Sequence, residues 1–234
     1  MEQIPEELIL LISEEKYEEA LVKLEAQLDC EPKNLSYLYW TGFCYLQIHN
    51  PLAAIHALSM CIEQENTLEY HTALMIAHFD AAQFEQALSL IQQGLQQHPK
   101  ESQYWRYLAY ITARNDRQQA DAFFHKAQEL SPQEYPLPSP LPDHAAIERA
   151  LSWLPSAGKK WIESLEILYE DNPSFDLLYM EAFPNHPLLP FILLEDTLFI
   201  FMNNLSYHPP NQSAESYLFE QLLDLWNHIQ QQSS

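Results

Sequence analysis

Residues 120–132, Ala120-Asp-Ala-Phe-Phe124-His-Lys-Ala127-Gln-Glu-Leu-Ser-Pro132, decide the fold, because their pattern returns upstream at near-constant intervals of 34, 33 and 33 residues. The small residue recurs as Ala20, Ala54, Ala87 and Ala120. The bulky apolar residue four positions later recurs as Leu24, Leu58, Ile91 and Phe124. The next two positions in phase carry Gln27, Cys61, Gly94 and Ala127, then Pro32, Asn66, Pro99 and Pro132. A repeat of this length indicates a stacked array of helix pairs.

Each repeated position has a physical role in such an array. The small residue lets two antiparallel helices approach, and the bulky residue one turn later fills the seam between them. Proline ends the second helix because it cannot donate to the helical ladder. Gly42 falls where the first helix of the second unit would touch its partner. The phase therefore predicts at least seven antiparallel helices before residue 131. The first helices carry large residues at helical spacing: Leu38, Thr41, Tyr45, Leu74, His78, Tyr104, Tyr107, Leu108 and Ile111.

These positions resemble the tetratricopeptide repeat family over residues 1–134. The second unit matches through Leu38-x-x-x-Gly42-x-x-Tyr45 and Ala54-x-x-x-Leu58, the fourth through Ala120 to Pro132, and the first only from Tyr17 onward. The resemblance implies a mainly α fold, a right-handed array of antiparallel helix pairs. Such arrays bind other proteins and rarely carry out chemistry themselves.

The resemblance also implies that the first helix of each pair lines a concave groove. An aromatic and aliphatic lining favours binding of an apolar or helical segment of a partner polypeptide. Relatives that grip the C-terminal carboxylates of heat-shock chaperones use Lys and Asn at these positions, which this chain lacks. The alternative, that the lining packs against the protein's own C-terminal part or another subunit, stays open here. The inward positions are Tyr39, Phe43, Leu46, Thr72, Ile76, Phe79, Trp105, Ala109 and Thr112.

Charge is the strongest compositional feature. The chain carries 11 basic and 33 acidic residues, a net charge of −22, and no Lys or Arg follows Lys160. Such a surface repels nucleic acid and anionic membranes and favours a basic protein partner; the alternative is that it only keeps the protein soluble. Only three glycines occur, which argues against a β-rich or nucleotide-cradling protein.

Cysteines and apolar runs bear on the compartment. Cys30, Cys44 and Cys61 are odd in number and lack a Cys-x-x-Cys pair, so we expect reduced thiols at helix-core positions in a cytoplasmic protein. Residues 1–20 read as an amphipathic helix rather than a signal peptide. The longest apolar run, residues 191–201, is interrupted by Glu195 and Asp196, so no membrane-spanning helix is predicted.

Residues 131–142 hold five prolines and predict a stiff linker at a domain boundary. Beyond it, residues 143–234 predict a small acidic α+β domain. Asp143 would cap a helix over residues 144–153. The remaining expected elements are a turn at 159–164, a strand at 165–169, a helix or loop at 175–180, strands at 191–194 and 198–201 paired around 195–197, and an amphipathic helix at 214–231.

A second resemblance concerns this C-terminal part. Ala150-Leu-Ser-Trp-Leu-Pro155, residues 165–173, Leu177-Leu-Tyr179 and Pro190-Phe-Ile-Leu-Leu194 resemble small bacterial zincin-like metallopeptidase domains. That family's chemistry needs His-Glu-x-x-His on the terminal helix. Here the helix reads Tyr217-Leu-Phe-Glu-Gln-Leu-Leu-Asp-Leu-Trp-Asn-His228, so the resemblance implies a degenerate domain without the zinc motif.

The sequence therefore predicts no catalytic residue, metal site or cofactor. The ten histidines include no pair at the spacing that one helix uses to chelate, although convergence of His186, His208 and His228 stays open. We interpret the chain as a cytoplasmic, non-enzymatic interaction protein, a chaperone or assembly adaptor. One alternative is an antitoxin-like or immunity-like protein that neutralises a basic partner. Another is a zincin-like peptidase whose repeats capture substrate. The sequence does not specify the oligomeric state.

Overall fold

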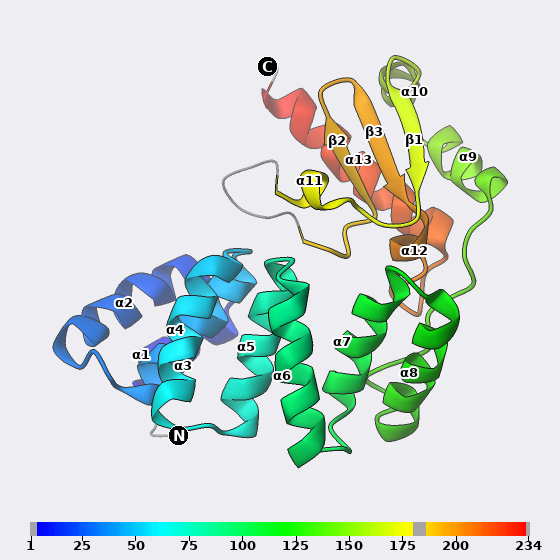
Figure 1. The fold of residues 1–234 in the computed structure, drawn as a ribbon. Helices are drawn as coiled ribbons and strands as arrows, with labels where there is room; N and C mark the ends of the chain where they lie inside the picture. The colour runs from blue at the N-terminus through cyan, green and yellow to red at the C-terminus, as the bar shows by residue number, and fades with distance from the viewer. Residues whose placement is uncertain (1–3, 180–185, 233–234) are drawn as a thin grey trace.

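The structure, a computed structural model, describes residues 4–179 and 186–232 (Figure 1). Eight helices make up its first half: α1 Glu6–Ser13, α2 Tyr17–Cys30, α3 Leu35–Gln47, α4 Pro51–Gln64, α5 Leu68–Asp80, α6 Phe84–Gln97, α7 Ser102–Ala113 and α8 Arg117–Leu130. The second half contains α9 His144–Ser152, α10 Ser156–Ile162, β1 Glu166–Glu170, α11 Phe175–Leu178, β2 Phe191–Leu194, β3 Thr197–Phe201, α12 Met202–Leu205 and α13 Ala214–Gln232.

The eight N-terminal helices form four antiparallel pairs that stand side by side in one row (Figure 1). The prediction of at least seven helices before residue 131 is confirmed, as is the mainly α, tetratricopeptide-like fold class. The C-terminal domain lies above the turns that join α5 to α6 and α7 to α8 (Figure 1).

The seam within each pair is as close as the sequence predicts. Ala20, Ala54, Ala87 and Ala120 are all 0% exposed, and the bulky residue one turn after each is also buried. A Cβ atom added to Gly42 would lie 2.5 Å from Cγ of Leu58 on the paired helix. Small residues at these points therefore set how near the helices can come.

Glycine also serves the contact between neighbouring pairs. A Cβ atom added to Gly94 on α6 would lie 2.2 Å from Cζ of Tyr104 on α7. Tyr104 is fully buried, and its hydroxyl lies 2.8 Å from Nδ1 of His71 on α5. Burial lowers the pKa of His71 below its ordinary value. The Tyr104 ring thus joins the third and fourth units, and Gly94 leaves room for it because it has no side chain.

The turns between paired helices share a left-handed residue. Glu15, His49 and Ala82 have φ angles of 59°, 57° and 53° and occupy the same place in the first three units. The next residue's amide bonds back to the helix that is ending, as in Lys16 N to Leu11 O at 2.9 Å. The equivalent geometry in three units shows that the repeat fixes the turns as well as the seams.

The cysteine prediction is confirmed for Cys44 and Cys61, which are buried, and is wrong for Cys30, which is exposed at the last position of α2. All three thiols are free. Burial raises the pKa of Cys44 to about 11 and that of Cys61 to about 12. Within residues 4–179 and 186–232, no helix combines the length and the apolar character needed to cross a membrane.

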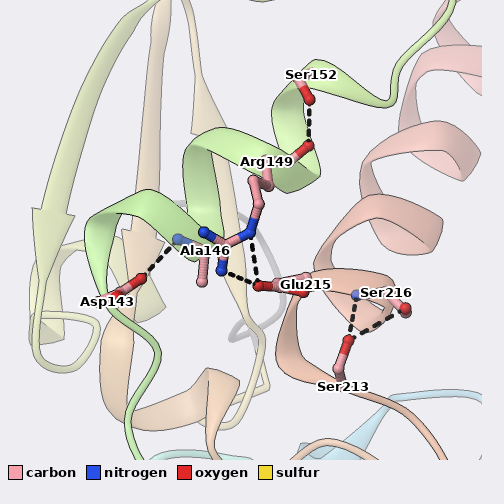
Figure 2. Close-up of polar contacts among 7 residues, drawn as sticks. All are labelled: Asp143, Ala146, Arg149, Ser152, Ser213, Glu215 and Ser216. Atoms are coloured by element: carbon pink, nitrogen blue, oxygen red, sulfur yellow. Dashed lines mark hydrogen bonds and ion pairs between the residues drawn. The ribbon is translucent and has the colours of Figure 1, made fainter.

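The C-terminal domain is a small α+β unit, as predicted. Its sheet has the order β1-β3-β2; β1 runs parallel to β3, while β2 and β3 form the predicted antiparallel hairpin. Helices α9 and α13 pack together on one face of the sheet, where Ile147, Leu198, Ile200, Leu218 and Leu222 form its core. Figure 2 shows Arg149 of α9 paired with Glu215 in the first turn of α13.

The boundaries of the predicted C-terminal elements shift only slightly. Asp143 caps α9, its Oδ1 accepting from the amide of Ala146 at 2.7 Å (Figure 2). The turn predicted at 159–164 comprises the end of α10 and the two residues after it. The helix or loop predicted at 175–180 contains α11, and Met180 lies outside the described residues. Residues 131–142 contain neither helix nor strand. That they mark the boundary between separately folding domains stays a prediction.

The seam makes a direct stability prediction. We expect Ala54→Leu or Ala120→Leu to overpack the paired helices and lower the free energy of unfolding by about 1–3 kcal/mol. Ala26→Leu is the matched control, because Ala26 is exposed on α2. Urea denaturation followed by circular dichroism measures the difference. Equal stability of the seam variants and the control would contradict the seam assignment.

Candidate functional site

The predicted binding residues lie on α3, α5 and α7, the first helices of their pairs, and we call them together the first-helix face. The structure leaves seven partly exposed and buries two. The partly exposed residues are Tyr39, Phe43, Leu46, Thr72, Ile76, Trp105 and Thr112. The buried ones are Phe79 and Ala109.

On α3, two aromatic residues of the first-helix face contact a third aromatic side chain. The ring of Trp40 lies 5.4 Å from that of Phe43 and 5.5 Å from that of Tyr39, both in edge-to-face geometry. We call Tyr39, Trp40 and Phe43 the α3 aromatic surface. Sequence reasoning missed Trp40, although its position three residues before Phe43 places the two on the same side of the helix.

Neighbouring helices fix the position of this surface. Tyr39 packs on the buried Tyr70 of α5, with ring centroids 5.5 Å apart, and Phe43 lies 6.3 Å from Tyr17 of α2. Burial, followed by the nearby Glu69 carboxylate, raises the pKa of Tyr39 well above its ordinary value. These ring contacts hold Tyr39 and Phe43 against α5 and α2.

Trp105 is set apart from the α3 aromatic surface. Its ring lies 5.9 Å from that of Phe123 on α8, and its Nε1 donates to the carbonyl of Pro99 at 2.9 Å. The contacts found within residues 4–179 and 186–232 do not join it to Tyr39 or Phe43. The structure therefore does not gather all of the predicted aromatic residues into one cluster.

Phe79 is covered by the C-terminal domain and is 1% exposed. Its ring lies 6.3 Å from that of His186, and its cluster includes Leu178 and Leu188 from the same domain. The alternative left open by the sequence, packing of the lining against the protein's own C-terminal part, thus applies at Phe79. Placing this residue on an accessible surface is wrong for this conformation.

Ala109 is buried for a different reason. It is 0% exposed and belongs to the core between α7 and α8, together with Ala113, Ala120 and Phe124. Tight packing between α7 and α8 buries this residue. Ala109 therefore supports the helix pair and is unavailable to a partner, which corrects its predicted place in the lining.

Three arginines hold the C-terminal half against the array. Arg106 donates to the carbonyl of Pro136 and Arg114 to that of Pro173, each at 2.8 Å. Arg117 lies 3.3 Å from the hydroxyl oxygens of Ser206 and Tyr207. Neutral oxygen atoms accept these bonds, so the arginines fix the docking without using the acidic side chains of the C-terminal domain.

Aromatic contacts reinforce this docking. The Arg114 guanidinium lies 4.6 Å from the ring centroid of Phe84 and 5.7 Å from that of Phe175. Burial lowers the pKa of Arg114 from its ordinary value. The Tyr179 hydroxyl donates to the carbonyl of Ala81 at 2.7 Å. Together these contacts cover the turn ends of α5 to α8.

The histidines do not form a metal site in the described part of the chain. No group of three or more His, Cys, Asp or Glu side chains suited to a metal ion occurs there. Nε2 of His186 instead lies 3.1 Å from Oδ1 of Asp80 on α5, and Nδ1 of His208 lies 2.8 Å from the carbonyl oxygen of Pro209. His186 thus takes part in the interdomain contact.

Comparison with known proteins shows a similarity of fold only. The chain matches no protein-family model and no curated protein. A crystal structure of MamA is similar at a TM-score of 0.47 and 18% identity, covering 52% of this chain and 72% of that one. MamA MSR-1 C2 (0.49, 21%, covering 54% and 74%) and the MamA RS-1 ArsTM double mutant (0.49, 22%, covering 54% and 72%) are similar as well. Similarities at these scores and identities do not indicate a function.

The arginine docking is testable by stability. Arg114→Ala removes the donor to the buried Pro173 carbonyl, and we expect the free energy of unfolding to fall by about 1–3 kcal/mol. Lys126→Ala, which removes only an exposed pair with Glu129, is the control and should change little. Thermal unfolding compares the two. Equal melting temperatures would show that Arg114 does not stabilise the docked arrangement.

Proposed function

We propose that this protein is a non-enzymatic interaction protein, a chaperone or assembly adaptor, that binds an apolar or helical segment of a partner polypeptide on the first-helix face. The observation that carries the proposal is the α3 aromatic surface, which is partly exposed and firmly seated on α2 and α5. Tyr39, Trp40 and Phe43 are each partly exposed, and the interdomain contacts found among the described residues do not involve them.

The chemistry of the face supports a polypeptide ligand. Large aromatic side chains contribute most of the binding energy in many protein interfaces, because they bury much area at little entropic cost. Ile76 adds an aliphatic contact one unit along the array, while Glu69 adds a carboxylate beside Tyr39. A partner segment with apolar side chains and a nearby basic residue fits this combination.

We also infer that the protein is cytoplasmic, and this inference and the non-enzymatic one both depend on residue content. The sequence of α13 from Tyr217 to His228 lacks the His-Glu-x-x-His motif that a zincin-like peptidase requires, which disfavours the peptidase alternative. Three unpaired thiols favour a reducing compartment. The antitoxin-like alternative depends on charge alone, because no Lys or Arg follows Lys160.

Substitution of the aromatic residues tests the proposal. We expect Phe43→Ala and Trp105→Ala each to weaken binding by about 1–3 kcal/mol. The partner is isolated from the native host with the wild-type protein, identified, purified and titrated against each variant by calorimetry. Leu52→Ala, which shortens an exposed side chain on α4, is the matched control and should bind normally. Circular dichroism confirms that each variant is folded.

A charge variant separates the alternative. Replacing Glu163, Glu166 and Glu170 together by Gln should mainly slow association, and salt should mask the effect. If Phe43→Ala and Trp105→Ala bind normally while the charge variant loses binding at every salt concentration, the first-helix face is not the site. The neutralisation of a basic partner by the C-terminal domain would then replace the adaptor function.

A further inference from the structure

The sheet of the C-terminal domain is apolar on both faces. Side chains alternate along a strand, and Ile167, Leu193, Leu198 and Ile200 point into the core with α9 and α13. The residues between them point to the opposite side. Five of these are apolar. Phe201, opposite Glu170, is fully buried, and the other four form what we call the outer sheet patch: Leu168, Ile192, Leu194 and Phe199.

The strand register joins these four residues into one surface. Phe199 on the central strand stands opposite Leu168 on one side and Ile192 on the other, while Leu194 stands opposite Thr197. All four are at least partly exposed, Leu168 at 38%, and none belongs to a buried cluster of the described residues. Three strands span about 10 Å, so the patch is wide enough for a ligand segment.

Acidic residues lie at both ends of the patch. Glu166 and Glu170 alternate with Leu168 on β1 and share its face. Glu195 and Asp196 form the exposed turn between β2 and β3, and the amide of Glu166 donates to the carbonyl of Asp196 at 2.8 Å, which holds that end together. No Lys or Arg after Lys160 balances these charges.

We propose that the outer sheet patch binds a basic amphipathic helix of a partner protein. An α-helix is about 10–12 Å wide, which matches three strands. Strands of four or five residues extend for about 15 Å, or about three helical turns. The ligand is therefore a helix with a three-turn apolar stripe and Lys or Arg at both ends, meeting the acids at both ends of the patch.

Charge decides between this ligand and other candidates. A second copy of the chain would bring two acidic rims together, which is repulsive, and anionic membranes and nucleic acid meet the same obstacle. A strand added beside β1 or β2 would leave the apolar face in water. This second surface is independent of the first-helix face, since the two share no residue.

The experiment uses a synthetic peptide of about 14 residues that forms such a helix, with a Leu stripe and Lys at both ends. Fluorescence anisotropy follows its titration with the full-length protein. We expect saturable binding that weakens as salt rises. A peptide with Glu for Lys and one with Ser for Leu should each fail to bind. Equal binding of either control peptide, or no binding of the basic peptide, would overturn the proposal.

Protein variants locate the peptide. Leu168→Thr and Phe199→Thr keep a strand-forming residue and should each weaken binding about tenfold. Leu52→Thr changes a side chain of comparable exposure, 43%, on α4 and should bind as the wild type does. Circular dichroism and melting temperature check the fold, with Ile192→Thr as a further variant if either of the first two is unfolded.

Three results would contradict the assignment. Normal binding by the sheet variants would show that the peptide does not use the patch. Loss of binding in Phe43→Ala alone would place the peptide on the first-helix face. A protein dimer detected by sedimentation and dissociated by Phe199→Thr would assign the patch to a second copy of the chain. The adaptor proposal is tested with the native partner and stands or falls separately.

Discussion

Close approach of the two helices in each pair is the constraint on which the rest of the structure depends. Four alanines in the seams have no exposed surface, and a Cβ atom added to Gly42 would overlap Leu58. The seam buries one side of every first helix. The opposite sides of these helices therefore repeat at regular spacing along the array and can make other contacts. The α3 aromatic surface is one product of that geometry, and the docking edge of α5 to α8 is another.

Three of the few basic residues of the array hold the C-terminal domain in place. Arg106, Arg114 and Arg117 bond to carbonyl and hydroxyl oxygens of the C-terminal half, including its linker. Most acidic residues of that domain are exposed, Glu163, Glu166, Glu195 and Asp196 among them, while Glu215 pairs with Arg149. The protein thus presents an aromatic face on its array and an acidic, apolar-centred face on its sheet, which suits two contacts with different chemistry.

Local pattern predicted most of the fold, and long-range contact explains what it missed. The repeat phase predicts the seams and the array helices, and short apolar runs predict β2 and β3, because these features are encoded by nearby residues. The parallel pairing of β1 with β3 joins segments about 30 residues apart and has no local signature. The repeat phase predicts an accessible Phe79 because it holds no information about the C-terminal domain that covers this residue. The repeat phase does not predict Trp40, because it gives only the ideal inward positions. A bulky side chain next to such a position can still contribute to the same surface.

Hydrogen exchange on the complex tests the central claim, that the array binds its partner through its first helices. The full-length protein is compared with and without the partner purified from the native host. We expect slower amide exchange in α3 and α5 on binding, because a ligand on the aromatic surface suppresses local opening of the helices beneath it. Unchanged exchange in α3 and α5, with protection confined to β1, β2 and β3, would contradict it.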